Sequence, residues 1–148
     1  MLDAQDRQRR ILIVDDDVAI QRLIKTVLQK DDCSCEVVAD GEQAIHAIAL
    51  QEPDVMLLDL MLPVLNGFQV LEILRTRFPH LLRETIVISA ASTKVLQDIE
   101  RYEAELAAVI RKPFDIGDLR DVVRRCDPAS QESPGARGQA ASKNSHAT

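Results

Sequence analysis

The feature that most constrains the fold is a short, uninterrupted apolar run that ends on an acid. Residues 55–58 are all apolar, and Asp59 closes the run. A run without polar alternation is typical of a strand that is covered on both faces, as in a parallel sheet. Pro63 and the Asn66-Gly67 pair then indicate a structured loop. The stretch therefore predicts a central parallel strand whose last residue is Asp59.

Five short apolar runs alternate with five segments of helical periodicity. The runs lie at residues 11–14, 35–39, 55–59, 85–89 and 106–110, and we expect each to form a strand. Apolar residues recur at helical spacing at residues 20–28, 44–49, 68–78, 92–102 and 119–123. Strands that alternate with helices predict an α/β fold, with a doubly wound, five-stranded parallel sheet between layers of helices.

Composition narrows the class of protein. The chain has 148 residues, enough for one domain. Its net charge is −6, which disfavours non-specific binding to nucleic acid or to an anionic membrane. No apolar run approaches the roughly 20 residues of a membrane span, and the N-terminus has no apolar signal core. Cys33, Cys35 and Cys126 form no CxxC pair, so we expect reduced thiols in the cytoplasm, with a Cys33–Cys35 redox pair as the alternative.

The composition changes after Cys126. Residues 127–148 contain almost no large apolar side chain and are rich in Ser, Ala, Gly, Pro and Gln. Such a segment cannot bury enough surface to offset its loss of conformational entropy, so we expect a disordered C-terminal tail. We expect residues 1–9 to form an N-terminal tail and residues 10–126 to form the folded domain. The C-terminal tail lacks a basic stripe and helical periodicity, which argues against direct nucleic acid binding.

Polar side chains stand at the ends of four predicted strands. In chain order they are Asp15 and Asp16, Asp59, Ser89 and Lys112. Because the carboxyl ends of parallel strands meet at one edge of a sheet, we expect these side chains to converge. Three clustered carboxylates repel one another, and Mg²⁺, which prefers oxygen ligands, would relieve that repulsion. With Lys112 and Ser89 placed to contact phosphoryl oxygens, the set predicts phosphoryl transfer to Asp59 as the nucleophile.

These motifs resemble the receiver domain of bacterial two-component response regulators. The resemblance covers about residues 10–126 and is carried by residues 11–17, 53–67, 86–90 and 112–114. It implies a flavodoxin-like (βα)5 fold with strand order 2-1-3-4-5, an order known for receivers and taken here from the resemblance. It also implies a response regulator that accepts a phosphoryl group and is not a turnover enzyme. We expect a stand-alone response regulator, with a fragment of a longer chain as the alternative.

The resemblance implies a role for each site residue. The expected ligands of Mg²⁺, or of Mn²⁺, are Asp15, Asp16, Asp59 and the backbone carbonyl of Met61. Asp59 would be the phospho-acceptor, and Ser89 and Lys112 would contact the phosphoryl group. The donor would be a phosphohistidine on a sensor histidine kinase or a histidine phosphotransfer protein. We further expect a downstream protein target, and a homodimer through the fourth helix, fifth strand and fifth helix.

Two departures from receivers bear on output and on hydrolysis. Val109 stands where receivers usually carry Tyr or Phe, three residues before Lys112. A β-branched aliphatic side chain cannot swing as an aromatic ring does, so we expect altered or weak output. Met61 and Ala91, two residues after Asp59 and Ser89, cannot orient an attacking water, which predicts a long-lived phosphoryl group.

Several alternatives stay open at this point. Asp17 is expected to cap a helix, with metal binding as the alternative. Ser89 could merely cap the following turn, and Lys112 could be a solvated surface charge. A degenerate receiver would bind partners without phosphorylation. A haloacid-dehalogenase-like phosphatase would use Asp15 as its nucleophile, with Ser89, Lys112 and Asp115 or Asp118 in support, but it would leave the Asp59 motif without a role.

Overall fold

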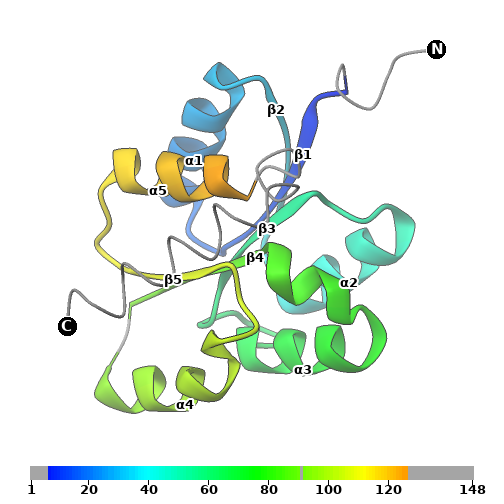
Figure 1. Cartoon of the computed structure of the whole chain (residues 1–148), viewed down its shortest axis with the longest axis vertical. Coiled ribbons are helices and arrows are strands. Elements are labelled where there is room, and N and C mark those ends of the chain that lie inside the picture. The colour runs from blue at the N-terminus through cyan, green and yellow to red at the C-terminus, as the bar shows by residue number, and fades with distance from the viewer. Residues whose placement is uncertain (1–6, 91, 127–148) are drawn as a thin grey trace, which may run out of the picture.

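The computed structural model describes residues 7–90 and 92–126, and these residues form an α/β fold around one five-stranded sheet (Figure 1). The strands are β1 (Arg9–Val14), β2 (Cys33–Val38), β3 (Val55–Asp59), β4 (Thr85–Ser89) and β5 (Ala108–Arg111). Their order across the sheet is β2-β1-β3-β4-β5, and each neighbouring pair is parallel. The predicted fold class and strand order are therefore confirmed.

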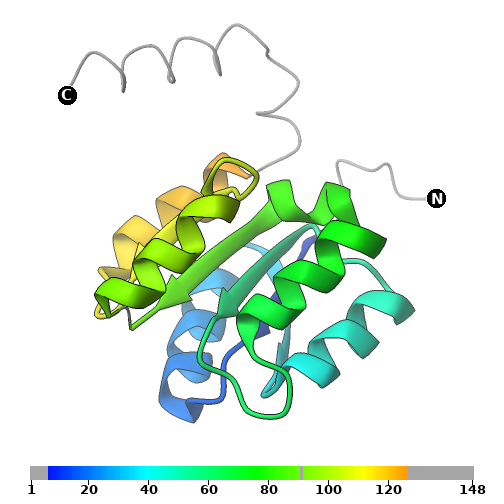
Figure 2. The ribbon, with the colours of Figure 1, turned by 90° about the horizontal axis from the view of Figure 1, so that it is seen from below.

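The helices cover both faces of the sheet (Figures 1 and 2). They are α1 (Val18–Lys30), α2 (Gly41–Leu50), α3 (Gly67–Arg77), α4 (Thr93–Glu103) and α5 (Ile116–Arg125), with a short 3₁₀ helix, η1 (Pro79–Glu84). α1 and α5 pack on one face, and α2, α3, η1 and α4 pack on the other. No helix within the described residues combines the length and apolarity needed to cross a membrane.

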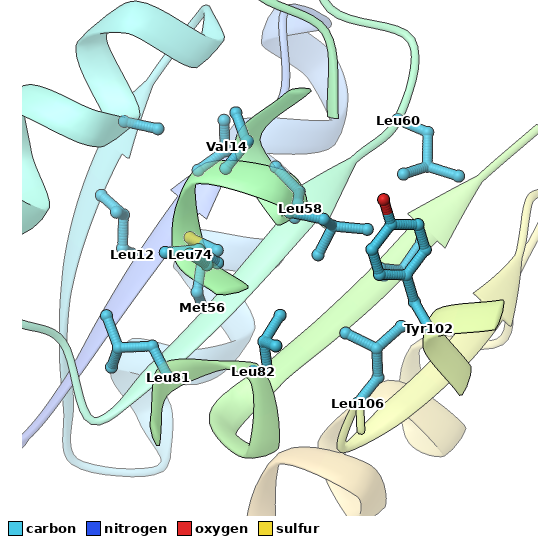
Figure 3. Packing of buried hydrophobic residues seen from close by; sticks show 14 of the residues in the cluster. Leu12, Val14, Met56, Leu58, Leu60, Leu74, Leu81, Leu82, Tyr102 and Leu106 are labelled. Carbon is cyan, nitrogen blue, oxygen red and sulfur yellow. The ribbon is translucent and has the colours of Figure 1, made fainter. Parts of the chain in front are cut away.

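Alternate residues of each central strand supply the two halves of the core. Leu12 and Val14 of β1 pack beneath α2 and α3, whereas Ile11 and Ile13 pack against α1 and α5. Figure 3 shows the first half, in which Leu12, Val14, Met56 and Leu58 face Leu74, Leu81, Leu82, Tyr102 and Leu106. Burial on both faces explains why the strand sequences are continuously apolar.

Side-chain caps fix where the helices begin. At the start of α1, α2 and α5 an Asp side chain accepts hydrogen bonds from backbone N–H groups of the helix. These residues are Asp17, Asp40 and Asp115 respectively. Asn66 and Gln69 form a reciprocal capping box at the start of α3, and Ser92 caps α4. The expected role of Asp17 at the start of a helix is confirmed.

The two edge strands differ from the predicted ranges. β2 begins at Cys33, which pairs with Arg9, and it stops before Ala39 because the Ala39 N–H donates to the Gln43 side chain of α2. β5 begins at Ala108, whereas Leu106 is buried in the turn that ends α4. Leu106 is therefore apolar because it is buried, although it does not pair in the sheet. The predicted C-terminal tail at 127–148 lies outside the described residues.

Candidate functional site

Asp59 is the last residue of β3, between β1 and β4, at the carboxyl edge of the sheet. Only 5% of Asp59 is exposed. Its Oδ1 accepts the Met61 backbone N–H at 3.0 Å, and its Oδ2 accepts the Lys112 ammonium at 3.1 Å. The predicted placement of Asp59 at the end of a buried central strand is therefore correct.

The other two acids follow β1 and lie beside Asp59. Carboxylate oxygens of Asp15, Asp16 and Asp59 all lie within 4.8 Å of one another. Asp15 is 3% exposed and accepts the Asp17 backbone N–H and the Lys112 ammonium, both at 2.9 Å, whereas Asp16 is exposed. Asp17 directs its own carboxylate to the backbone of Ala19 and Ile20. It is thus a helix cap, and it lies outside the acid cluster.

Lys112 ties the two buried acids together. Its backbone N–H donates to the carbonyl of Ser89 at 2.8 Å, which anchors the residue to the end of β4. Burial lowers the pKa of the ammonium, but its hydrogen bonds to Asp15 and Asp59 outweigh burial, so the net pKa is raised. Lys112 therefore stays charged, and it is not a solvated surface lysine.

Burial dominates the electrostatics of Asp59. Removal from water raises its pKa, while hydrogen bonds from Met61 and Lys112 pull the pKa down, and the charge of Asp15 raises it further. The net pKa lies above the usual range of an aspartate, so the ionised carboxylate is destabilised in its site. A cation bound among the three acids would remove that destabilisation.

Ser89 supplies a hydroxyl that no described residue uses. Ser89 is 2% exposed, and its Oγ is buried without a hydrogen-bond partner. The cap of α4 is Ser92, so Ser89 does not have the capping role considered as an alternative. Ser89 closes β4, whose Ile88 pairs with Asp59. An unused buried hydroxyl at the end of the strand next to β3 can donate to an oxygen atom added at Asp59.

The loop from β3 to α3 is held tightly against the site. Gly67 donates its N–H to the Leu60 carbonyl at 2.9 Å, and an added Cβ would lie 2.5 Å from the Leu60 Cα and 2.6 Å from the Asp59 carbonyl oxygen. Leu65 donates to Pro63 at 2.7 Å around Val64, whose φ is +65°. A valine at positive φ is strained.

Two contacts near the site were not predicted. The Gln21 side chain donates to the Asp15 backbone carbonyl. Gln21 lies one helical turn after the cap Asp17, and this spacing is the sequence feature that could have predicted its contact with the end of β1. The second is Tyr102 of α4, which is buried in the same half of the core as Val109 and donates its hydroxyl to Glu72. The buried aromatic of this region thus stands on α4 and not on β5.

The chemistry of the three acids fits a hard divalent cation. Asp15, Asp16 and Asp59 offer carboxylate oxygens, two from buried side chains and one from an exposed side chain. Mg²⁺ prefers oxygen ligands and keeps several coordination positions for water and phosphate. Receiver domains generally bind Mg²⁺ in such an acidic pocket. The backbone carbonyl of Met61 stays a predicted ligand, because only its N–H contact with Asp59 is established.

The structure thus combines a five-stranded parallel α/β sheet with a buried aspartate, two further acids and a lysine at its carboxyl edge. The sequence profile of the response regulator receiver domain matches residues 11–124. The chain therefore belongs to the response regulator receiver family, and this membership removes the phosphatase alternative.

Named relatives and solved structures agree with the family. The chain is 35% identical over 117 residues to the DNA-binding response regulator MtrA of Mycobacterium tuberculosis, covering 79% of this chain and 50% of MtrA. It is 29% identical over 116 residues to the regulatory protein AtoC of Escherichia coli, covering 78% of this chain and 24% of AtoC. The chain thus spans about half or less of the length of these relatives.

Two solved receiver domains have the same fold. A CheY-like receiver domain protein from Methanospirillum hungatei has a TM-score of 0.73 at 26% identity, covering 86% of this chain and all of that chain. The receiver domain of the Francisella response regulator 1452 has a TM-score of 0.70 at 29% identity, covering 84% of this chain and 98% of that chain.

Proposed function

We propose that this protein accepts a phosphoryl group on Asp59 from a phosphohistidine donor, in a reaction that depends on Mg²⁺. The observation that carries the proposal is the convergence of three carboxylates within 4.8 Å, with the Lys112 ammonium bonded to two of them. An oxygen of Asp59 forms the new bond to phosphorus as the bond from phosphorus to the donor imidazole nitrogen breaks. The protein is a phospho-acceptor and not a turnover enzyme.

The residues around Asp59 have separable roles in this transfer. A bound Mg²⁺ would offset negative charge on the transferring group. Lys112 supplies a fixed positive charge next to Asp59, and Ser89 supplies the unused hydroxyl that can donate to a phosphoryl oxygen. Met61 donates its N–H to Asp59 Oδ1, which holds the carboxylate in one orientation.

Exposed apolar side chains support a protein partner at this edge. Val18, at the start of α1, and Met61 and Val64, in the loop after Asp59, are all exposed. They lie within three residues of Asp15 or five of Asp59. Apolar side chains gathered near a charged site favour docking of another protein. We propose that this partner is the phosphohistidine domain of a sensor kinase or of a phosphotransfer protein.

We propose that signalling then proceeds in the cytoplasm through a protein target or by phosphate relay, without direct contact with nucleic acid. We also propose a long-lived phosphoryl group, since the exposed side chain of Met61 cannot orient an attacking water. Ala91, the second residue in that prediction, lies outside the described residues. Homodimerisation through α4, β5 and α5 stays a prediction.

The test is the intact mass of the protein after incubation with acetyl phosphate and Mg²⁺. We expect the wild type to gain one phosphoryl group, and we expect the gain to disappear in Asp59→Asn and on addition of EDTA. Asp98→Asn makes the same chemical change on the exposed surface of α4 and should leave the gain intact. An unmodified wild type, or a gain that survives Asp59→Asn, would refute the proposal. The first outcome would favour a phosphorylation-independent binding module.

A further inference from the structure

A cavity lies between α1 and α5, at the opposite end of the sheet from Asp59. Its volume is about 350 Å³. Arg9, the first residue of β1, lines it, whereas Asp15 follows the last residue of the same strand. Figure 1 shows α1 and α5 side by side on one face of the sheet. A ligand in this cavity would therefore not touch the acid site.

The lining combines an apolar floor with a surplus of positive charge. The lining residues are Arg9, Leu28, Lys30, Asp31, Asp32, Cys33, Arg120, Val123 and Arg124. Four basic side chains thus face two carboxylates, in a protein whose net charge is −6. Such a concentration of cations runs against the charge of the whole chain and creates a local positive potential.

One acid holds two of the cations in place. Asp31, which caps the end of α1, accepts the Arg120 Nε at 2.9 Å and the Arg120 Nη2 at 2.6 Å. Arg124 Nη2 lies 3.6 Å from the same carboxylate. The hydrogen bond from Arg120 lowers the pKa of Asp31, so this acid is ionised at neutral pH. Asp31 carries one negative charge against the two guanidinium groups of Arg120 and Arg124. The only further acid in an ion pair with them among the described residues is Asp121, whose Oδ1 lies 4.0 Å from Arg124 Nη1.

The remaining two cations, Arg9 and Lys30, have N–H groups without an acceptor among the described residues. Arg9 donates its Nη2 to the Val123 carbonyl at 2.8 Å, which fixes the guanidinium against α5. Its Nε is buried without an acceptor, and neither Arg9 nor Lys30 forms an ion pair with a described residue. Arg10 Nε is also unpaired, but Arg10 borders a cavity of only about 20 Å³, which suits a water molecule.

We propose that the cavity between α1 and α5 binds a small organic phosphate monoester. The guanidinium groups of Arg9 and Arg124 and the ammonium of Lys30 would contact the phosphate, since guanidinium matches phosphate oxygens in geometry and charge. The apolar floor of Leu28, Cys33 and Val123 would contact the organic part. A volume of about 350 Å³ is at the small end of the range for ligand sites, which suits a small ligand.

The test is titration of the ¹⁵N-labelled full-length protein with AMP, followed by NMR, with adenosine and inorganic phosphate as parallel probes. We expect amide shifts at Cys33 and Val123, with saturation at about 1 mM AMP, and weaker binding of both other probes. Arg9→Gln and Arg124→Gln should each weaken AMP binding about tenfold, because each removes one charged hydrogen-bond donor.

Two controls separate this site from general attraction and from the acid site. Arg125→Gln removes the same charge from the neighbouring position of α5, outside the cavity lining, and should leave AMP binding unchanged. Asp59→Asn should also leave it unchanged. The Arg124 side chain is 60% exposed, so Arg124→Gln will fold even if Arg9→Gln does not.

Three results would overturn the proposal. The first is the absence of amide shifts with AMP at about 5 mM. The second is equal binding by the wild type, Arg124→Gln and Arg125→Gln, which would show unspecific attraction to a basic surface. The third is AMP binding no tighter than adenosine or inorganic phosphate, which would show that the cavity does not recognise a phosphate monoester.

Discussion

Replacing Asp59 with Asn should stabilise the fold at neutral pH when no divalent cation is present. The two acid neighbours lie within 4.8 Å of Asp59 and Lys112 lies at 3.1 Å. At an effective dielectric constant of about 20, the repulsion from the two acids is about 7 kcal/mol and the attraction to Lys112 is about 5 kcal/mol, so they cancel in large part. Burial of the carboxylate adds an effective penalty of several kcal/mol. The Met61 N–H recovers about 2 kcal/mol. We expect Asp59→Asn to gain about 2 kcal/mol.

Urea unfolding with and without Mg²⁺ measures this gain. In EDTA the midpoint of Asp59→Asn should lie about 1 M above that of the wild type. Mg²⁺ at about ten times its Kd should stabilise the wild type by about 1.4 kcal/mol and reduce the difference. Asp98→Asn on the surface of α4 is the matched control and should shift the midpoint little.

The pH dependence provides an independent check on the cause. The folded-state pKa of Asp59 is raised, so the folded protein takes up this proton before the unfolded chain does as the pH falls. The wild type therefore loses stability as the pH rises through the window between the unfolded and folded pKa values. The advantage of Asp59→Asn should be full at neutral pH and should shrink on acidification. The reasoning would be refuted if Asp59→Asn were less stable than the wild type in EDTA. It would also be refuted if the stability difference between the two proteins changed with neither pH nor Mg²⁺.

Three further substitutions test the supports of the site, each by urea unfolding. Gly67→Ala should cost about 3 kcal/mol, because its Cβ would lie 2.5 Å from the Leu60 Cα, and a loss below about 1 kcal/mol would contradict this. Val64→Gly should gain about 1 kcal/mol by relieving the strain of a φ of +65°, and a loss would contradict that account. Tyr102→Phe should cost about 1 kcal/mol by removing the hydrogen bond to Glu72, an effect that should vanish in a Glu72→Ala background, which has no acceptor for the hydroxyl.

The central part of the fold could be predicted because burial and pairing coincide there. β3 and β4 are buried at every residue, and their observed ranges match the predicted ranges 55–59 and 85–89. β5 is an edge strand with no fully buried residue, so the apolar run marks it only approximately. In an edge strand the backbone can pair where the side chain is exposed, and the sequence pattern then gives its boundaries poorly.

The acid site could be predicted for a topological reason that does not extend to the rest of the molecule. All the predicted site residues lie at or just after strand ends. A parallel sheet brings these ends together regardless of how the helices are oriented on it. The contact of Gln21 with Asp15 and the cavity between α1 and α5 depend instead on how particular helices rotate on the sheet. Arg9 and Arg124 lie at opposite ends of the described chain, and no local spacing relates them.

The surroundings of Val109 bear on how phosphorylation could reach the surface formed by α4 and β5. Tyr102 packs 6.4 Å from the Phe68 ring, with the Arg75 guanidinium 4.5 Å from its ring centre. Its hydroxyl donates to Glu72, so this one side chain fastens α4 to α3. Val109, whose register partner on β4 is Val87, has no hydroxyl or ring that could move together with Ser89. Displacement of α4 must therefore break the contacts of Tyr102 with α3. Output through α4 should accordingly strengthen in Tyr102→Phe, which loosens that attachment while keeping the ring.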